Sequence, residues 1–220
     1  LLTGRYPHTT GIYFLSPGYQ SAPVLKGVKT MPERFADDGF EVMGVGKIFH
    51  SQGNQVFAKV GSYGGGMGGF GPRPQKKISQ PHGHPLWDWG AFPERDDQMP
   101  DYSVANWAIE RLEKRYDKPF FLAVGFWRPH VPMFAPKKWF DLHPRDQIKL
   151  PVIQEKDNDD ISSYAWDLTN VNHVSPKHKW VKEAGQWDHA VQSYLASTSF
   201  VDHQLGRVLK ALEESEHRDN

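Results

Sequence analysis

The sequence predicts an α/β fold in which helices cover both faces of a sheet. Two compact apolar runs, at residues 40–46 and 120–126, have the length and composition of buried strands. A long amphipathic helix is indicated near the end of the chain, where apolar residues recur at intervals of three and four between residues 187 and 212. Because strands and helices alternate along the chain, we expect an α/β sandwich.

The composition is that of a globular protein without net charge. The 220 residues include 26 basic and 26 acidic side chains. This balance gives no reason to expect nucleic acid or a membrane surface as a partner, and no apolar run is as long as a membrane span. The absence of cysteine excludes a disulfide framework and thiolate chemistry within these residues.

The first fifty residues predict a helix end, a loop, a short helix and a strand. Residues 1–4, with the sequence LLTG, are typical of a last helical turn that a glycine terminates. A short helix is predicted at residues 31–36, with Thr30 as its N-cap and Pro32 in its first turn. The strand at residues 40–46 then leads into the segment Lys47-Ile48-Phe49-His50.

Residues 51–100 are rich in glycine and proline, and they include the run GGGMGG at residues 64–69. No helical period holds there. We therefore expect a long surface insertion with some short strands. The next helix is predicted to start at Asp101, and its apolar face consists of Val104, Trp107, Ala108 and Leu112.

The second strand, at residues 120–126, is apolar on both faces, which predicts a place in the centre of a sheet. Residues 144–186 predict mostly loop. The final helix carries Asp202 in its apolar stripe, and a buried carboxylate needs partners. We therefore expect Asp202 to make a structural hydrogen bond.

Basic side chains follow both predicted strands. Lys47 and His50 come after the first strand, and Arg128 and His130 come after the second. In open α/β sheets, ligands bind outside the carboxyl ends of the strands. Any one of these cations could be a solvated loop residue, but two such clusters favour a pocket for an anion such as phosphate, sulfate or carboxylate.

Other motifs carry less chemistry. The segment His82-Gly83-His84 with Asp88 does not have the spacing of a standard zinc site, and we expect no metal site within the chain. The glycine run lacks the Lys-Ser/Thr ending of a P-loop. Neither a Ser-His-Asp set nor a pair of catalytic carboxylates is evident.

Several ordered motifs carry a resemblance to a known family. Residues 1–12, LLTGRYPHTTGI, resemble the second half of the type I sulfatase signature. Residues 46–50, GKIFH, resemble the family's second motif in its iduronate-2-sulfatase-like branch, and residues 120–132, FFLAVGFWRPHVP, resemble the segment that brings a further histidine to the sulfate. Residues 192–207 resemble the long helix that precedes the last metal-binding motif.

The resemblance implies the alkaline-phosphatase/sulfatase-like α/β/α sandwich, with a central mixed sheet flanked by helices. Residues 1–220 are then expected to be part of the N-terminal catalytic domain, truncated at both ends. The nucleophile of the family is a formylglycine made from Cys or Ser, and its place would lie upstream of Leu1. The ligands of the family's divalent cation, usually Ca²⁺, would lie outside this chain as well.

The resemblance also implies roles for individual residues. Lys47 would contact the sulfate and the leaving oxygen, and His50 would hydrogen-bond the formylglycine hydroxyl. His130 would bind sulfate and donate a proton to the leaving alcohol. Arg5 closes the signature and is expected to brace its loop. Arg128 could read a substrate carboxylate bidentately, or it could be a surface cation.

The expected function is hydrolysis of sulfate esters of sulfated sugars or glycosaminoglycans, such as 2-sulfated iduronate, by a longer parent enzyme. The 220 residues alone are expected to be inactive. By family, export is expected, to the periplasm or exterior in bacteria and to the lysosome in animals. Two alternatives are a phosphodiesterase or phosphonate hydrolase of the same superfamily, and a non-catalytic carbohydrate-binding protein whose tryptophans stack on sugars.

Overall fold

The two apolar runs of the sequence form neighbouring parallel strands in the computed structural model. Strand β1 (Glu41–Gly46) pairs with β4 (Phe120–Gly125) along its whole length, from Glu41 opposite Phe120 to Gly46 opposite Gly125. The short strand β2 (Ser62–Tyr63) pairs with β1 on its other side, so the strand order is β2-β1-β4. The structure describes residues 2–50, 54–154, 156, 158–169 and 175–219. Leu1, the first residue of the expected signature, lies outside them.

The chain divides into two compact units. Unit 1 consists of Leu1–Gly69, Pro100–Trp127 and Gln204–Asn220, and unit 2 consists of Phe70–Met99 and Arg128–His203. The three strands above belong to unit 1, as do the short helices α1 (Pro7–Thr10) and η1 (Pro23–Leu25). Each unit has its own buried apolar cluster.

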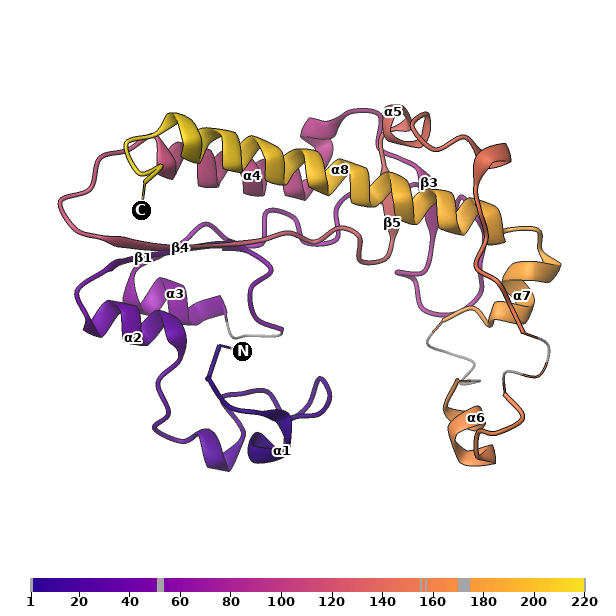
Figure 1. Ribbon diagram of the computed structural model, residues 1–220, viewed down its shortest axis with the longest axis horizontal. Helices are drawn as coiled ribbons and strands as arrows, with labels where there is room; N and C mark the ends of the chain where they lie inside the picture. Colours follow the sequence, from indigo (N-terminus) through magenta and orange to yellow (C-terminus); the bar gives the residue numbers. More distant parts are fainter. Residues whose placement is uncertain (1, 51–53, 155, 157, 170–174, 220) are drawn as a thin grey trace. The chain divides into compact units, whose positions relative to one another are not determined.

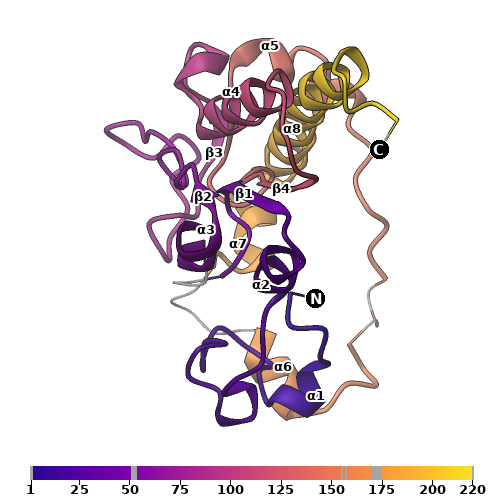
Figure 2. The same ribbon diagram turned by 90° about the vertical axis from the view of Figure 1, so that its left-hand side faces the viewer.

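Unit 1 has the three layers that the sequence predicts. Helices α2 (Met31–Asp37) and α3 (Gln55–Val60) cover one face of the sheet. Helix α4 (Pro100–Leu112) and the last turns of α8 (Trp187–Glu214) cover the other face (Figures 1 and 2). The side chains of β4 alternate accordingly. Phe121 and Ala123 pack with Val42 and Phe57 beneath α2 and α3. The alternate residues Phe120, Leu122 and Val124 pack against α4 and α8.

Local signals explain why helix α2 begins where it does. The Thr30 backbone N–H and hydroxyl both donate to Glu33 Oε2 at 2.8 Å, and Pro32 occupies the first turn. This reciprocal cap satisfies backbone donors that the first turn of a helix leaves without intrahelical partners. The predicted short helix at residues 31–36 is therefore confirmed, with one further residue at its end.

Two expectations about the sheet are corrected. Strand β4 was expected in the centre, but among the described residues β1 is the central strand and β4 pairs only with β1. The central sheet was expected to be mixed, but every described strand pairing is parallel. Apolar residues on both faces of β4 indicate that helices cover both faces of the sheet. They do not indicate how many strands pair with β4.

That residues 51–100 form an insertion stays a prediction, but its described part, residues 54–100, does not lie wholly at the surface. They contribute α3, β2, β3 (Trp89–Ala91) and η3 (Asp96–Gln98), and Phe57 and Trp89 are at most 1% exposed. The glycine run packs closely: a Cβ on Gly64 would lie 2.6 Å from the Trp107 ring. Glycine is needed at that position for close approach.

Unit 2 is built around a second parallel pair, in which β3 pairs with β5 (Met133–Ala135). Its buried cluster consists of Met99, Ala135, Phe140, Ala196 and Phe200. The shorter helices are α5 (Lys137–Phe140), η4 (Arg145–Gln147), α6 (Ser163–Thr169) and α7 (His178–Glu183). The prediction that residues 144–186 are mostly loop is confirmed for the described part of that segment.

Helix α8 is confirmed, but its buried face differs from the predicted stripe. Asp202 is exposed, and Leu205 and Leu209 are 43% and 49% exposed. Asp202 is therefore not the buried carboxylate expected from its place in the stripe. The buried side chains recur mainly at intervals of four and are small or polar in several places: Gln192, Ser193, Ala196, Ser197, Phe200, Gln204 and Val208. No helix among the described residues is long and apolar enough to cross a membrane.

Candidate functional site

The backbone of Lys47 is fixed where β1 leaves the sheet. Lys47 N–H donates to Gly125 O at 2.8 Å, which extends the β1–β4 pairing by one bond. A Cβ on Gly125 would lie 2.1 Å from Lys47 O, and a Cβ on Gly46, whose φ is +77°, would lie 2.0 Å from Gly125 O. Two glycines therefore allow the strand ends to approach closely enough to place Lys47 at the carboxyl end of the sheet.

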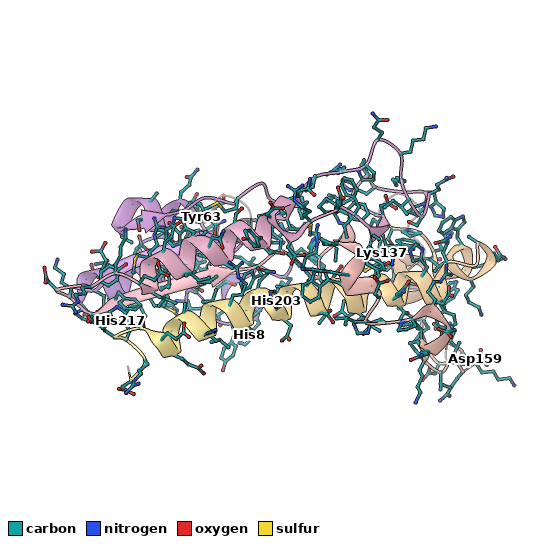
Figure 3. The ribbon with its side chains drawn as sticks, turned by 90° about the horizontal axis from the view of Figure 1, so that it is seen from above. His8, Tyr63, Lys137, Asp159, His203 and His217 are labelled. Carbon is teal, nitrogen blue, oxygen red and sulfur yellow. The ribbon has the colours of Figure 1, made fainter. Side chains whose placement is uncertain are left out.

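The Lys47 side chain lies against Trp127, the second residue after β4. Its ammonium nitrogen is 5.4 Å from the centroid of the Trp127 ring, within the range of a cation–π interaction. Tyr63, labelled in Figure 3, adds a donor next to this loop, because its hydroxyl donates to Gly46 O at 2.7 Å. Burial raises the pKa of Tyr63, so its hydroxyl keeps its proton at neutral pH.

His50 is exposed at the end of the same loop. The backbone before it is fixed, because the side-chain oxygen of Asn54 accepts from Ile48 N–H at 3.3 Å and from Phe49 N–H at 2.8 Å. The Phe49 ring is buried and packs against Tyr19, with ring centroids 5.1 Å apart. The loop is thus anchored on both sides of Lys47, and it presents His50 to solvent.

Arg128 opens the corresponding segment of unit 2, and it is buried. Its side chain is 4% exposed, with Nε donating to Phe134 O and Nη2 donating to Phe70 O, both at 2.9 Å. Arg128 was expected to read a substrate carboxylate or to be a surface cation. Its burial excludes a surface cation, and its bonds to the two backbone carbonyls brace the loop that carries His130. A role for Arg128 in binding a substrate carboxylate stays a prediction.

His130 is exposed, and its ring orientation is fixed by two contacts. Its Nδ1 lies 2.6 Å from Val131 O, and its ring lies 5.0 Å from the ring of Phe70. A carbonyl oxygen can only accept, so Nδ1 carries a proton. Arg128 holds the backbone of Phe70, and Phe70 in turn packs against His130.

Arg5 lies on an exposed segment of unit 1. The preceding chain is tied to helix α2, because Met31 N–H donates to Leu2 O at 2.7 Å. Arg5 itself contributes to a shallow hollow with Gly4, Lys29 and Asp38. A bracing role for Arg5 stays a prediction.

Asp88 has a structural task. It is 3% exposed, and its carboxylate accepts from Ile78 N–H, from Ser79 N–H and hydroxyl, and from Trp89 N–H at 2.6–3.0 Å. The nearby His82 ring packs against Trp180, with centroids 5.3 Å apart. Within the described residues, no group of three or more His, Cys, Asp or Glu side chains could hold a metal ion. These residues therefore do not fit a calcium site, and we assign no step to a metal held by them.

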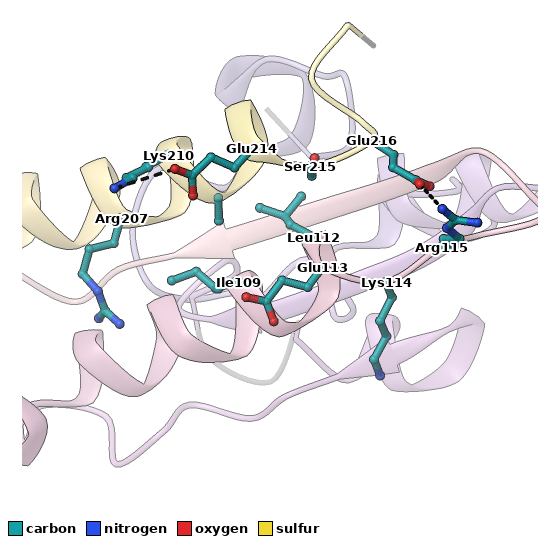
Figure 4. A pocket seen from close by; sticks show the side chains of 11 residues that line it. Ile109, Leu112, Glu113, Lys114, Arg115, Arg207, Lys210, Glu214, Ser215 and Glu216 are labelled. Carbon is teal, nitrogen blue, oxygen red and sulfur yellow. Dashed lines mark hydrogen bonds and ion pairs between the residues drawn. The ribbon is translucent and has the colours of Figure 1, made fainter.

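A cleft of about 610 Å³ in unit 1 lies apart from the predicted site residues (Figure 4). It is lined by the ends of α4 and α8, and charges of both signs face it, including the ion pair of Lys210 with Glu214 at 3.7 Å. Neither Lys47 nor His50 lines it. We do not assign this cleft to the anion site.

The structure thus gathers the predicted residues in two places. Lys47 and His50 share one anchored loop in unit 1, and Arg128 and His130 share another in unit 2. Sequence reasoning did not identify Trp127, Asp101 or Phe70 as supports of these loops. The sequence offered one signal for a supporting role of Trp127, which is its position between the apolar run 120–126 and Arg128.

Comparisons with known proteins identify the family of the chain. The Sulfatase family profile matches residues 1–220. A Formosa agariphila protein named sulfatase is 40% identical, with all of this chain and 46% of that protein aligned. Human iduronate 2-sulfatase is 28% identical over 97% of this chain and 42% of its own length. The chain therefore spans less than half the length of these relatives.

The fold is shared with solved sulfatases. The structure of a 2-O GAG sulfatase superposes on 99% of this chain and 43% of its own chain, with a TM-score of 0.52 and 20% sequence identity. The alkaline-phosphatase-like α/β fold expected from the sequence is thereby confirmed. Together with the profile match over every residue and the 40% identical relative, this likeness leads to one conclusion: the chain belongs to the sulfatase family.

Proposed function

We propose that the protein is a sulfuric ester hydrolase that acts on sulfated sugars, and that this chain supplies the basic half of its sulfate site. The observation that carries the proposal is the placement of Lys47. The glycine pair Gly46 and Gly125 fixes the Lys47 backbone at the carboxyl end of β1, and the ammonium nitrogen lies 5.4 Å from the centroid of the Trp127 ring. Parallel α/β sheets bind their ligands at that edge.

Each basic residue has a task in this proposal. The Lys47 ammonium offers three N–H donors to sulfuryl oxygens and neutralises charge that grows in the transition state. His50 donates or accepts a hydrogen bond at the nucleophile's hydroxyl. His130 already carries a proton on Nδ1, toward Val131 O, so a second proton on Nε2 is the one that it transfers to the leaving alcohol.

The rest of the site is proposed to come from the remainder of the protein. A nucleophile formed from Cys or Ser would attack sulfur, and a divalent cation would neutralise further charge; the residues described above hold neither group. We therefore propose that the isolated 220 residues do not turn over sulfate esters.

For the substrate we propose a 2-O-sulfated uronate within a glycosaminoglycan or related polysaccharide. The support is the match to human iduronate 2-sulfatase along nearly the whole chain. We also propose that the protein is exported, which cell fractionation with a chain-specific antibody would test.

The proposal is tested by assaying the complete protein against an aryl sulfate and a 2-sulfated uronate disaccharide. We expect Lys47→Ala and His130→Ala to lower kcat/KM at least about a hundredfold, in the range for losing one charge-stabilising group. The exposed Lys59→Ala and His84→Ala serve as matched controls and should leave it unchanged. Preference for a phosphate diester would point to the phosphodiesterase alternative, and sugar binding without turnover would point to a non-catalytic protein.

A further inference from the structure

Trp127 is held by one backbone and one side-chain hydrogen bond that do not involve Lys47. Its backbone N–H donates to Asp101 Oδ1 at 2.7 Å, and its indole N–H donates to Gly66 O at 3.0 Å. Asp101 is fully buried in the first turn of α4. An aromatic side chain has only two rotatable bonds, so these contacts leave the ring little freedom.

The acceptor of the indole bond is itself fixed to the sheet. Gly64 N–H donates to Gly44 O and Gly46 N–H donates to Gly65 O, both at 2.8 Å, so the glycine run continues the β2 pairing along β1. Trp107 occupies the space where a Gly64 side chain would lie. The carbonyl of Gly66 therefore follows a paired segment, and Trp127 is joined through it to the strand that precedes Lys47.

Lys47 is the flexible member of this arrangement. Its backbone is fixed by Gly125, but a lysine side chain has four methylene groups and many rotamers. The centroid of the Trp127 ring lies 5.4 Å from the ammonium nitrogen. Among aromatic side chains, the indole ring attracts a cation most strongly. A cation resting on a ring face still has N–H donors for an anion.

From this geometry we infer that Trp127 is a positioning residue for Lys47, and that its indole face orients the ammonium group toward the sulfate. The inference rests on the proposed function, because it takes Lys47 as a sulfate ligand. It adds a residue that acts on the sulfate through Lys47. Positioning of Lys47 requires the Lys47 side chain, and this makes it separable from a general structural role of Trp127.

The test is a double-mutant cycle on the complete protein, with affinity for inorganic sulfate measured by isothermal titration calorimetry. Trp127→Leu should weaken sulfate binding about 3- to 30-fold, the range that a cation–π contact contributes. In the Lys47→Ala background the same change should have less than about a twofold effect, because its partner is gone. Trp127→Phe keeps a weaker ring and should lie between Trp127→Leu and the wild type.

The matched control is Trp139→Phe. Trp139 also has a lysine over its ring, with Lys138 Nζ 4.9 Å from the centroid, and it lies in unit 2. It should leave sulfate affinity within about twofold of wild type. A second readout needs no sulfate: the ring current of Trp127 should shift the Lys47 side-chain proton signals upfield in NMR spectra, and Trp127→Leu should abolish this shift.

The outcomes distinguish failure of the inference about Trp127 from failure of the proposed role of Lys47. Equal effects of Trp127→Leu with and without Lys47 would overturn the inference alone. Unchanged sulfate affinity in Lys47→Ala would remove the proposed site, and the inference with it. If Trp127→Leu does not fold, Trp127→Phe decides: unchanged sulfate affinity and an unchanged Lys47 shift in that variant would overturn the inference.

Discussion

The close approach of the strand ends at Gly125 gives a sharp prediction for Gly125→Ala. The new Cβ would lie 2.1 Å from Lys47 O and 2.4 Å from Lys47 C, both backbone atoms. Real Cβ contacts essentially never fall below 3.0 Å, so the ends of β1 and β4 must move apart by roughly 1 Å. The substitution should therefore break the hydrogen bond from Lys47 N–H to Gly125 O.

The cost has two parts. Overpacking against a rigid neighbour costs about 1–3 kcal/mol, and losing the bond from Lys47 N–H to Gly125 O adds about 0.5–1.5 kcal/mol. We therefore expect the free energy of unfolding to fall by about 2–4 kcal/mol and Tm to fall by roughly 5–15 °C. Sulfate affinity should fall as well, because the Lys47 loop is displaced.

The assay is urea unfolding followed by circular dichroism, with Gly206→Ala as the matched control. Gly206 lies within α8, and a Cβ there meets nothing within 4 Å. Alanine should therefore stabilise the helix by about 0.5–1 kcal/mol. A Gly125→Ala protein with wild-type stability and sulfate affinity would refute the argument that close backbone approach positions Lys47.

Three further predictions follow from buried polar groups. Asp101→Ala should destabilise the protein by about 1–3 kcal/mol in urea unfolding, because Trp127 N–H loses its acceptor, whereas Asp101→Asn should cost less. Arg128→Met should destabilise by a similar amount, about 1–3 kcal/mol, because two backbone carbonyls lose their donors; exposed Arg218→Met, its control, should change stability little. Burial, aided by nearby Arg145, lowers the pKa of His189. An unfolded histidine titrates near about pH 6.5. The stability that neutral His189 contributes is therefore fully present above that pH and is lost as pH falls through the lower folded pKa. His189→Gln should flatten the loss of stability in that window, and an unchanged slope would contradict the assignment.

The sequence predicted the elements whose signals are local. The cap at Thr30, the apolar runs of β1 and β4 and the helical period of α4 each act over a few residues, and the structure contains all of them. The family resemblance also anticipated the alkaline-phosphatase-like fold. Local periodicity does not indicate how many strands a given strand pairs with. For that reason the predicted central position of β4 was wrong among the described residues.

Long-range contacts account for the other errors. Glycines at residues 64–69 suggested a flexible surface segment, but they permit contact with Trp107 and Trp127, which lie far along the chain. The buried face of α8 includes serine and glutamine, so its apolar residues alone indicated the wrong stripe. No sequence pattern indicates that the Arg128 guanidinium binds the carbonyls of Phe70 and Phe134.

The central claim is that Lys47 and His130 belong to a sulfate site, and the most direct test is calorimetric titration of the complete protein with inorganic sulfate. Losing a hydrogen bond to a charged group weakens binding about tenfold or more. We predict at least this loss for Lys47→Ala and for His130→Ala, with Lys59→Ala unchanged. Wild-type sulfate affinity in both Lys47→Ala and His130→Ala would contradict the account.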